Sequence, residues 1–139
     1  MKNKILNISE TRFEIIKSKI NPNDTFLVEL DGKEIQNKTQ LFDIMEKEYD
    51  LHTSDGTWDR NWDALDDLME DLDWIPQQKH ILAVHSFSNM FSQDKKSKEI
   101  FFDGLKMYLE FWEKDVLHCV VEGKTKEFTV SVFSGELVK

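Results

Sequence analysis

The chain of 139 residues is long enough for one domain with a hydrophobic core, and its 40% hydrophobic residues exclude disorder as the default state. Its net charge of −9 repels nucleic acid and anionic lipid, which disfavours a direct RNA- or DNA-binding role. The single cysteine, Cys119, excludes an internal disulfide, and residues 1–8 hold no apolar run long enough for a signal peptide. We therefore expect a cytoplasmic protein.

Two kinds of pattern alternate along the chain. Apolar residues at spacings of three and four predict helices over residues 9–20, 39–49, 61–72 and 98–114. Runs of β-branched and aromatic residues predict strands over residues 25–30, 79–85, 116–121 and 126–133. The expected N-caps of the first three helices are Ser9, Thr39 and Asn61.

This alternation favours an α/β fold with a small, mostly parallel sheet flanked by helices. The strand over 79–85 is apolar enough to be buried on both faces. The strand over 126–133 alternates polar and apolar residues and follows a tight turn at 122–124. We expect this last strand to pair antiparallel at an edge of the sheet, with one face in water.

The most charged part of the chain is the segment over residues 55–75. It holds eight acidic residues and one base, Arg60, for a net charge of −7, whereas the other 118 residues hold 19 acidic and 17 basic residues. On a helical wheel the apolar residues of the segment fall on one side: Trp62, Leu65, Leu68, Met69 and Leu72. Carboxylates fall on the opposite side: Asp63, Asp66, Asp67 and Glu70.

Like charges lie one helical turn apart at positions 63/67, 66/70 and 67/71. Each such pair destabilises a helix by roughly 0.2–0.5 kcal/mol, so the pattern is unusual for a simple solvated face, which mixes signs. A local arrangement that weakens the fold indicates a binding face, although the solvated face remains the alternative. Carboxylates on a rigid helix imitate a run of phosphates and would fit a cationic groove. Trp58 and Trp74 flank the helix, either as exposed anchors or as core residues.

The residues from Trp58 to Leu68, WDRNWDALDDL, resemble the signature helix of the barstar family. In order, that pattern is an aromatic residue, a position that is often Gly, any residue, Asn, an apolar residue, Asp-Ala-Leu, any residue, Asp, any residue and Leu. The strand, turn and helix over 26–49, the strand over 81–84 and the helix and strand over 98–121 match the rest of the family. The resemblance covers residues 25–121 of a single domain over 1–139, with an N-terminal helical extension over 1–24 and a C-terminal β extension over 122–139.

The resemblance implies a three-stranded parallel sheet and inhibition of a microbial ribonuclease, whose active site receives this helix and the loop before it. By position, Asp67 matches the carboxylate that blocks the active site, Asp63 a second contact, and Trp58 the aromatic contact loop. A further contact of the family is a Glu near the end of the last helix, which is Glu110 or Glu113 here. Asp59 stands where the family often has Gly.

Two further departures from the family lie on the helix itself. Asp66 replaces a large aromatic residue of the inhibitor after which the family is named, and Glu70 replaces a small polar one. The surface is therefore more acidic than that inhibitor's. The expected partner-binding residues are Trp58, Asp59, Asp63, Asp66, Asp67, Glu70, Trp74, Glu110 and Glu113.

Three alternatives stand beside the inhibitor. A small enzyme is disfavoured because His80 and His85, five apart on a strand, point to opposite faces, and because the chain has no metal-binding or phosphate-loop motif. His118 and Cys119, adjacent on a strand, also diverge. A calcium site is disfavoured because the acidic segment lacks a calcium loop, and we expect neither a metal nor another cofactor. The third alternative keeps the fold and changes the target to another basic nuclease or toxin.

Overall fold

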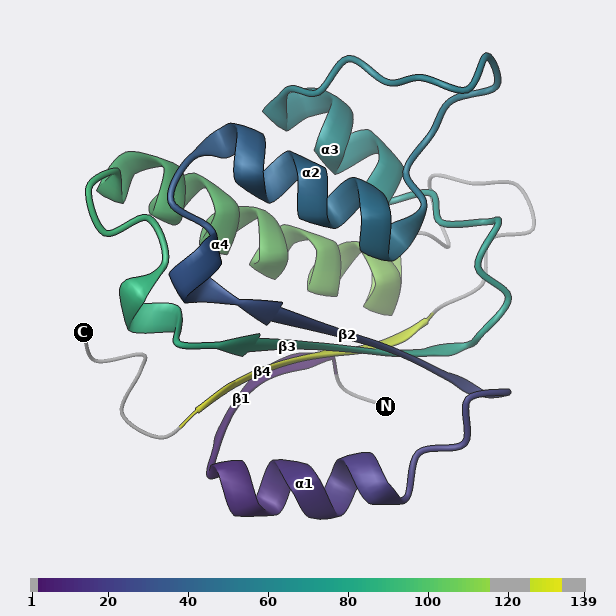
Figure 1. Ribbon diagram of the computed structural model, residues 1–139. Coiled ribbons are helices and arrows are strands. Elements are labelled where there is room, and N and C mark those ends of the chain that lie inside the picture. The colour runs from purple at the N-terminus through teal and green to yellow at the C-terminus, as the bar shows by residue number, and fades with distance from the viewer. Residues whose placement is uncertain (1–2, 116–125, 134–139) are drawn as a thin grey trace.

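The computed structural model (Figure 1) describes residues 3–115 and 126–133, which form a sheet covered by helices. The four strands are β1 (Lys4–Ile8), β2 (Thr25–Asp31), β3 (Lys79–His85) and β4 (Glu127–Phe133). Their order in the sheet is β1-β4-β3-β2, and every neighbouring pair is parallel. The four α-helices are α1 (Glu10–Ser18), α2 (Lys38–Tyr49), α3 (Trp62–Met69) and α4 (Lys95–Glu110). The predicted α/β class and the parallel sheet flanked by helices are confirmed.

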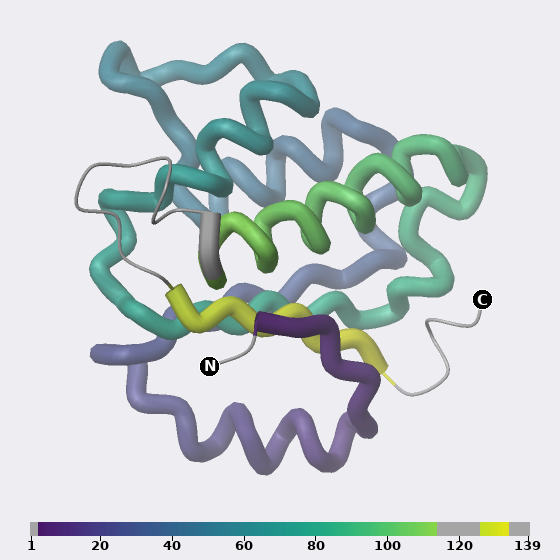
Figure 2. The backbone as a smooth tube through the Cα atoms, turned by 180° about the vertical axis from the view of Figure 1, so that it is seen from behind, coloured from purple at the N-terminus to yellow at the C-terminus, as the bar shows by residue number. Residues whose placement is uncertain are grey.

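Helices cover both faces of the sheet, with α1 on one face and α2, α3 and α4 on the other (Figures 1 and 2). Strand side chains alternate between the two faces, so the sheet divides the apolar residues into two cores. The larger core lies beneath α2, α3 and α4, and the smaller one joins Phe13 of α1 to Ala83 and Phe133. Of the three helices on the larger side, α3 lies farthest from the sheet in both views.

Strand β1 was not predicted, because its five residues, KILNI, are too few to give a clear periodic signal. It pairs with β4, from Lys4 opposite Thr129 to Ile8 opposite Phe133. The side chain of Asn3 fastens this edge: its amide donates to the carbonyls of Leu109 (3.1 Å) and Lys126 (2.9 Å) and accepts the N–H of Phe128 (2.9 Å). The part of the chain over 1–24 is therefore more than a helical extension.

Strand β4 confirms that a strand follows residue 125, but its predicted position and pairing are wrong. It lies inside the sheet between β1 and β3 and is parallel to both, rather than antiparallel at an edge. Both of its faces are buried, since Val130 is 0% and Ser131 is 3% exposed. The physical reason is that β1 takes the edge and α1 covers the face that was expected to be wet. The strand predicted over 116–121 and the turn over 122–124 lie outside the described residues.

The helices begin close to the predicted positions, and capping side chains explain the differences. Ser9 and Asn61 cap α1 and α3 as predicted. Asn37 rather than Thr39 caps α2, through a 2.9 Å hydrogen bond from the N–H of Gln40. The carboxylate of Asp94 caps α4, which therefore begins at Lys95, three residues before the predicted start. Five residues over 111–115 continue α4 as a π-helix.

A close approach of two chain segments joins the ends of β2 and β3. A Cβ atom on Gly32 would lie 2.3 Å from the carbonyl oxygen of Ser86, so only glycine fits there. Across the described ranges, no helix is both long enough and apolar enough to span a bilayer.

Candidate functional site

Helix α3 turns one face into the core and the opposite face to solvent. Leu65 and Met69 are 0% exposed, whereas Asp63 and Asp67 lie on the exposed side, one helical turn apart. The predicted separation of apolar and acidic residues is therefore observed for these four positions. Helix α3 lies on the outer side of the helical layer (Figure 1), and Asp63 and Asp67 are both exposed there.

The N-terminus of α3 is well capped, whereas the helix dipole and ion pairs only partly balance the charges of its aspartates. The side chain of Asn61 accepts the N–H of Ala64 at 2.8 Å. Asp63, in the first turn, interacts favourably with the positive end of the helix dipole, but Asp67 lies in the last turn, where the dipole opposes it. Among the residues that the structure describes, neither aspartate forms an ion pair. Within the described part of the chain, the charges of Asp63 and Asp67 are thus left without a paired cation.

Asp66 differs from its two acidic neighbours because it is half-buried against α4. Its carboxylate accepts the hydroxyl hydrogen of Tyr108. Burial raises the pKa of Asp66, the Tyr108 hydrogen bond lowers it, and the charges of Asp63 and Asp67 raise it, with a net upward shift. Gly104 makes this approach possible, because a Cβ there would lie 3.3 Å from the Tyr108 hydroxyl. Asp66 therefore joins α3 to α4 as well as adding charge to the surface.

The two tryptophans that flank α3 both serve the packing of the protein itself. Trp58 is only 8% exposed, and its indole N–H donates to the carboxylate of Glu46 at 2.6 Å. The expectation that Trp58 is an exposed anchor is therefore wrong, and the core alternative holds. Trp74 is half-buried, and its indole N–H donates to the main-chain carbonyl of Tyr49 at 2.8 Å. Asp59, next to Trp58, is exposed.

The acidic segment continues past the C-terminal end of α3, which comes at Met69 rather than at Leu72 as predicted. Glu70 is the half-buried C-cap residue. Burial raises the pKa of Asp71, and the neighbouring charge of Asp73 adds to the shift. Both carboxylates lie on the exposed side of this end. The acidic surface thus extends beyond the helix itself.

Glu110, the last residue of α4, and Glu113, in the π-helix that continues it, line a different surface from Tyr108 and Trp112, which contact α3. They line a shallow hollow together with Asn3 and Ile5 of the N-terminal edge. The carboxylate of Glu113 accepts the N–H of Asn3 at 3.0 Å. Tyr108, by contrast, contacts Asp66. The structure does not bring these two glutamates together with the exposed aspartates of α3.

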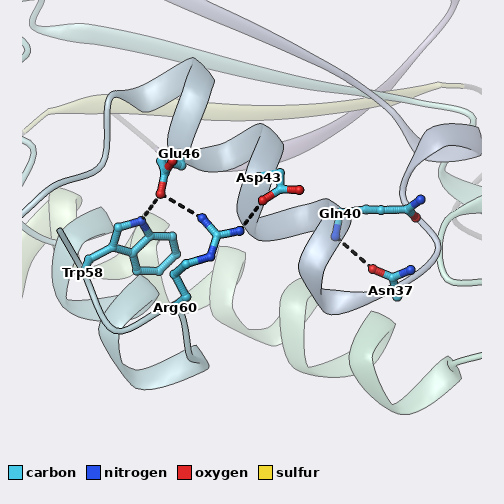
Figure 3. Close-up of polar contacts among 6 residues, drawn as sticks. All are labelled: Asn37, Gln40, Asp43, Glu46, Trp58 and Arg60. Carbon is cyan, nitrogen blue, oxygen red and sulfur yellow. Dashed lines mark hydrogen bonds and ion pairs between the residues drawn. The ribbon is translucent and has the colours of Figure 1, made fainter.

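Arg60, the single base among residues 55–75, contacts α2 (Figure 3). Its guanidinium donates to Glu46 at 2.8 Å and to Asp43, and it lies over the ring of Trp58 with Cζ 5.6 Å from the ring centroid. We call Arg60, Trp58, Asp43 and Glu46 the Arg60 clamp. The available signal was the spacing of Asp43 and Glu46, which puts two carboxylates on one face of the predicted helix.

His80 and His85, the two described histidines considered for catalysis, lie on opposite faces of the sheet. His80 is 1% exposed and stacks on Phe128 in the larger core, and burial lowers its pKa to about 4. His85 stacks on Phe133 on the α1 side, so the two histidines do point to opposite faces as predicted. His118 and Cys119 lie outside the described residues. Within those residues, no group of three or more His, Cys, Asp or Glu is arranged to hold a metal ion.

A family model described as Barstar (barnase inhibitor) matches residues 25–131, which run from β2 into β4. The match therefore extends past residue 121 and includes most of β4. The search of curated proteins returns no match.

Proposed function

Because the chain belongs to the Barstar (barnase inhibitor) family, we propose that it inhibits a cationic ribonuclease by covering the active site of that enzyme with α3. One observation carries the proposal: Asp63 and Asp67 lie exposed together on a capped helix, without an ion-pair partner among the described residues. Charges that the fold itself leaves unbalanced are available to a cationic partner.

The proposed mechanism is steric occlusion guided by charge. Asp67 takes the position that a substrate phosphate would occupy, and Asp63 binds a neighbouring cationic side chain of the enzyme. The surrounding carboxylates, Asp59, Asp66 and Glu70, strengthen the negative field that draws the two proteins together. Complementary fields of this kind increase the association rate more than they increase the final affinity. We propose that the protein does so as a cytoplasmic binding protein, not as an enzyme.

The remaining candidate residues have other parts in the proposal. Trp58 supports the loop before α3 through its hydrogen bond to Glu46 of α2. Trp74 supports the segment after α3 through its hydrogen bond to the Tyr49 carbonyl. Glu110 and Glu113, beside β1, would contact only a partner that extends well beyond α3.

A second target of the same class is favoured by the charge of the segment. Eight acidic residues against one base over 55–75 suit an enzyme with a strongly basic active-site groove. We therefore keep as the alternative an immunity or regulatory role against another basic nuclease or toxin. A metal ion or other cofactor has no part in either role.

The test is inhibition of RNA hydrolysis by barnase, with wild-type protein, Asp67→Ala and Glu14→Ala as inhibitors. Glu14→Ala is the matched control, because it removes the same charge from an exposed position of α1, on the opposite side of the sheet. We expect inhibition by the wild type and by Glu14→Ala. Asp67→Ala should bind about 30-fold more weakly or worse, as for a charge lost from a buried pair.

Salt dependence separates steering from simple contact. The rate of association with barnase should fall steeply between low and physiological ionic strength, because screening shortens the range of the field. Equal inhibition by Asp67→Ala and Glu14→Ala would contradict the role of α3. Failure of the wild type to inhibit barnase would refute barnase-type inhibition and leave the basic-nuclease alternative.

A further inference from the structure

We infer that Arg60 is a positioning residue: the carboxylates of α2 hold its guanidinium and thereby fix the turn that leads into the acidic helix. The inference rests on the proposed function, because it concerns how the binding surface on α3 is presented. The residues that carry it are those of the Arg60 clamp, none of which lies on α3 itself.

The clamp uses both terminal nitrogens of the Arg60 guanidinium. One donates to Glu46 at 2.8 Å, the other donates to Asp43, and Cζ lies over the ring of Trp58. Glu46 in turn accepts the indole N–H of Trp58 at 2.6 Å (Figure 3). A planar fork that meets two carboxylates and an aromatic ring has a fixed orientation, which a lysine ammonium would not have.

The main chain at Arg60 shows why such a clamp is needed. Arg60 has φ of 53°, in the left-handed region, and the next residue is Asn61, the N-cap of α3. A residue with a Cβ is disfavoured there relative to the right-handed region. Contacts elsewhere in the residue must therefore hold the turn. The side chain of Arg60 makes those contacts with α2, so the direction in which α3 leaves the turn depends on them.

The packing beneath the turn agrees with this reading. Phe42 of α2 contacts the rings of Trp58 and Trp62 edge-to-face, at centroid distances of 5.6 Å and 5.3 Å. The first residue of α3 and the clamp are thus seated on the same side chain of α2. A shift of the turn would move both tryptophans and with them the start of the acidic face.

The clamp also determines where the only base of the acidic segment lies. Arg60 is three residues before Asp63, close enough in sequence for a released guanidinium to approach that carboxylate. Asp43 and Glu46 engage it instead. The two α2 carboxylates therefore act on the partner-binding face indirectly, by keeping a cation away from it.

Two roles for Arg60 predict opposite results when its charge is removed. If Arg60 were only a positive charge near the site, Arg60→Gln would strengthen attraction to a cationic partner and speed association. If Arg60 positions the turn, the same change weakens the complex, chiefly through faster dissociation, because binding must then order a looser surface. The sign of the change in Kd thus distinguishes the roles.

The experiment compares wild type, Arg60→Gln, Arg60→Lys, Glu46→Gln and Glu48→Gln. Two measurements are made: amide hydrogen exchange of Ala64 and Leu65 in the protein alone, and the rates of association with and dissociation from barnase. Glu48→Gln is the matched control, because it removes one carboxylate from the same helix without touching the clamp. Both amides bond to Asn61, so they report the first turn of α3.

We expect exchange at Ala64 and Leu65 to be about threefold to tenfold faster in Arg60→Gln, Arg60→Lys and Glu46→Gln, and unchanged in Glu48→Gln. Binding to barnase should weaken by a similar factor in Arg60→Gln and Arg60→Lys, even though the lysine keeps the charge. The effects of Arg60→Gln and Glu46→Gln should be clearly non-additive in the double variant, as for two residues in contact.

The inference is overturned if Arg60→Gln leaves exchange unchanged and binds barnase as tightly as the wild type or more tightly. Full rescue by Arg60→Lys would also overturn it, because charge alone would then suffice. If the wild type does not bind barnase, the proposed function fails, and the exchange of Ala64 and Leu65 still decides whether the clamp holds the turn.

Discussion

The two sides of the sheet treat charge in opposite ways. Between α1 and the sheet, Glu29 accepts from Lys17 at 2.8 Å and from His85 at 2.8 Å, and the second ring nitrogen of His85 lies 3.6 Å from Glu10. On the outer face of α3, the exposed Asp63 and Asp67 form no ion pair among the described residues.

The difference separates charge that serves the fold from charge that serves binding. Beneath α1, Lys17 balances the charge of Glu29, and His85 contacts both Glu29 and Glu10, which fastens the helix beside Phe13 and Phe133. Asp63 and Asp67 lack such balance among the described residues, although the neighbouring α4 carries four lysines. We therefore expect changes beneath α1 to lower stability without affecting binding, and the loss of an exposed carboxylate from α3 to weaken binding without lowering stability.

The largest effect expected beneath α1 comes from Phe13, which is 1% exposed. Phe13→Ala should lower the free energy of unfolding by about 3–5 kcal/mol, the usual result of emptying a buried aromatic site. Denaturant unfolding measures this change. Phe13→Leu is the milder companion variant, and while folded it should bind barnase as tightly as the wild type. Weaker binding by folded Phe13→Leu would break the comparison.

A change at Tyr108 tests whether the carboxylate of Asp66 contributes to stability through its hydrogen bond to α4. Tyr108→Phe removes the donor to half-buried Asp66 and should lower the free energy of unfolding by about 1–3 kcal/mol. Tyr49→Phe is the control, because the Tyr49 hydroxyl is buried with no hydrogen-bond partner among the described residues. That change should be neutral or stabilising. Equal losses in the two variants would mean that the Asp66 hydrogen bond contributes nothing.

Removing one carboxylate from each side should give opposite signs. Asp67→Asn relieves repulsion with Asp63 and Asp71 and should raise the free energy of unfolding by about 0.2–0.5 kcal/mol. Glu29→Gln removes a paired charge and should lower it, by up to about 1 kcal/mol because the pair is partly exposed. Thermal or denaturant unfolding at neutral pH and moderate salt compares them. The same sign in both variants would contradict the division of roles.

The smallest effects are expected in the pH dependence of stability. Burial alone would raise the pKa of Glu29, but hydrogen bonds from Lys17 and His85 and their charges outweigh it and lower that pKa. Stability from Glu29 is therefore present above its ordinary pKa near 4.5 and is lost as pH falls through the lowered value.

The pKa values of Asp66 and Asp71 are raised, so the folded state binds their protons more tightly than the unfolded state does. Their contribution must fall as pH rises from about 3.8 through the raised values. The free energy of unfolding should be measured between pH 3 and pH 6. Asp66→Asn should reduce its decrease with rising pH, and Glu29→Gln should reduce its increase with rising pH. A pH profile unchanged by both substitutions would refute these assignments.

Local patterns in the sequence were sufficient for the elements whose signal is contained within them. Strand β3 was predicted to the residue, because an apolar run between polar flanks has only one interpretation at that length. The amphipathic character of α3 follows from spacing alone. The five residues of β1 carry too short a pattern, and the buried setting of β4 depends on β1 and α1, which lie more than a hundred residues earlier.

The site shows the same boundary between local and distant causes. Exposure of Asp63 and Asp67 follows from the helical wheel. Burial of Trp58 depends on Phe42 and Glu46 of another helix, and the half-buried state of Asp66 depends on Tyr108, 42 residues away. No periodicity within residues 55–75 encodes those contacts.

The edge that β1 covers has a consequence for trimming the chain. A fragment limited to residues 25–131, the part that matches the family, would lack β1 and the amide of Asn3, leaving the outer N–H and C=O groups of β4 without partners. A bare, apolar strand edge is a template for pairing with other chains. We expect such a fragment to aggregate through β4, so residues 3–8 act as a built-in shield against self-association.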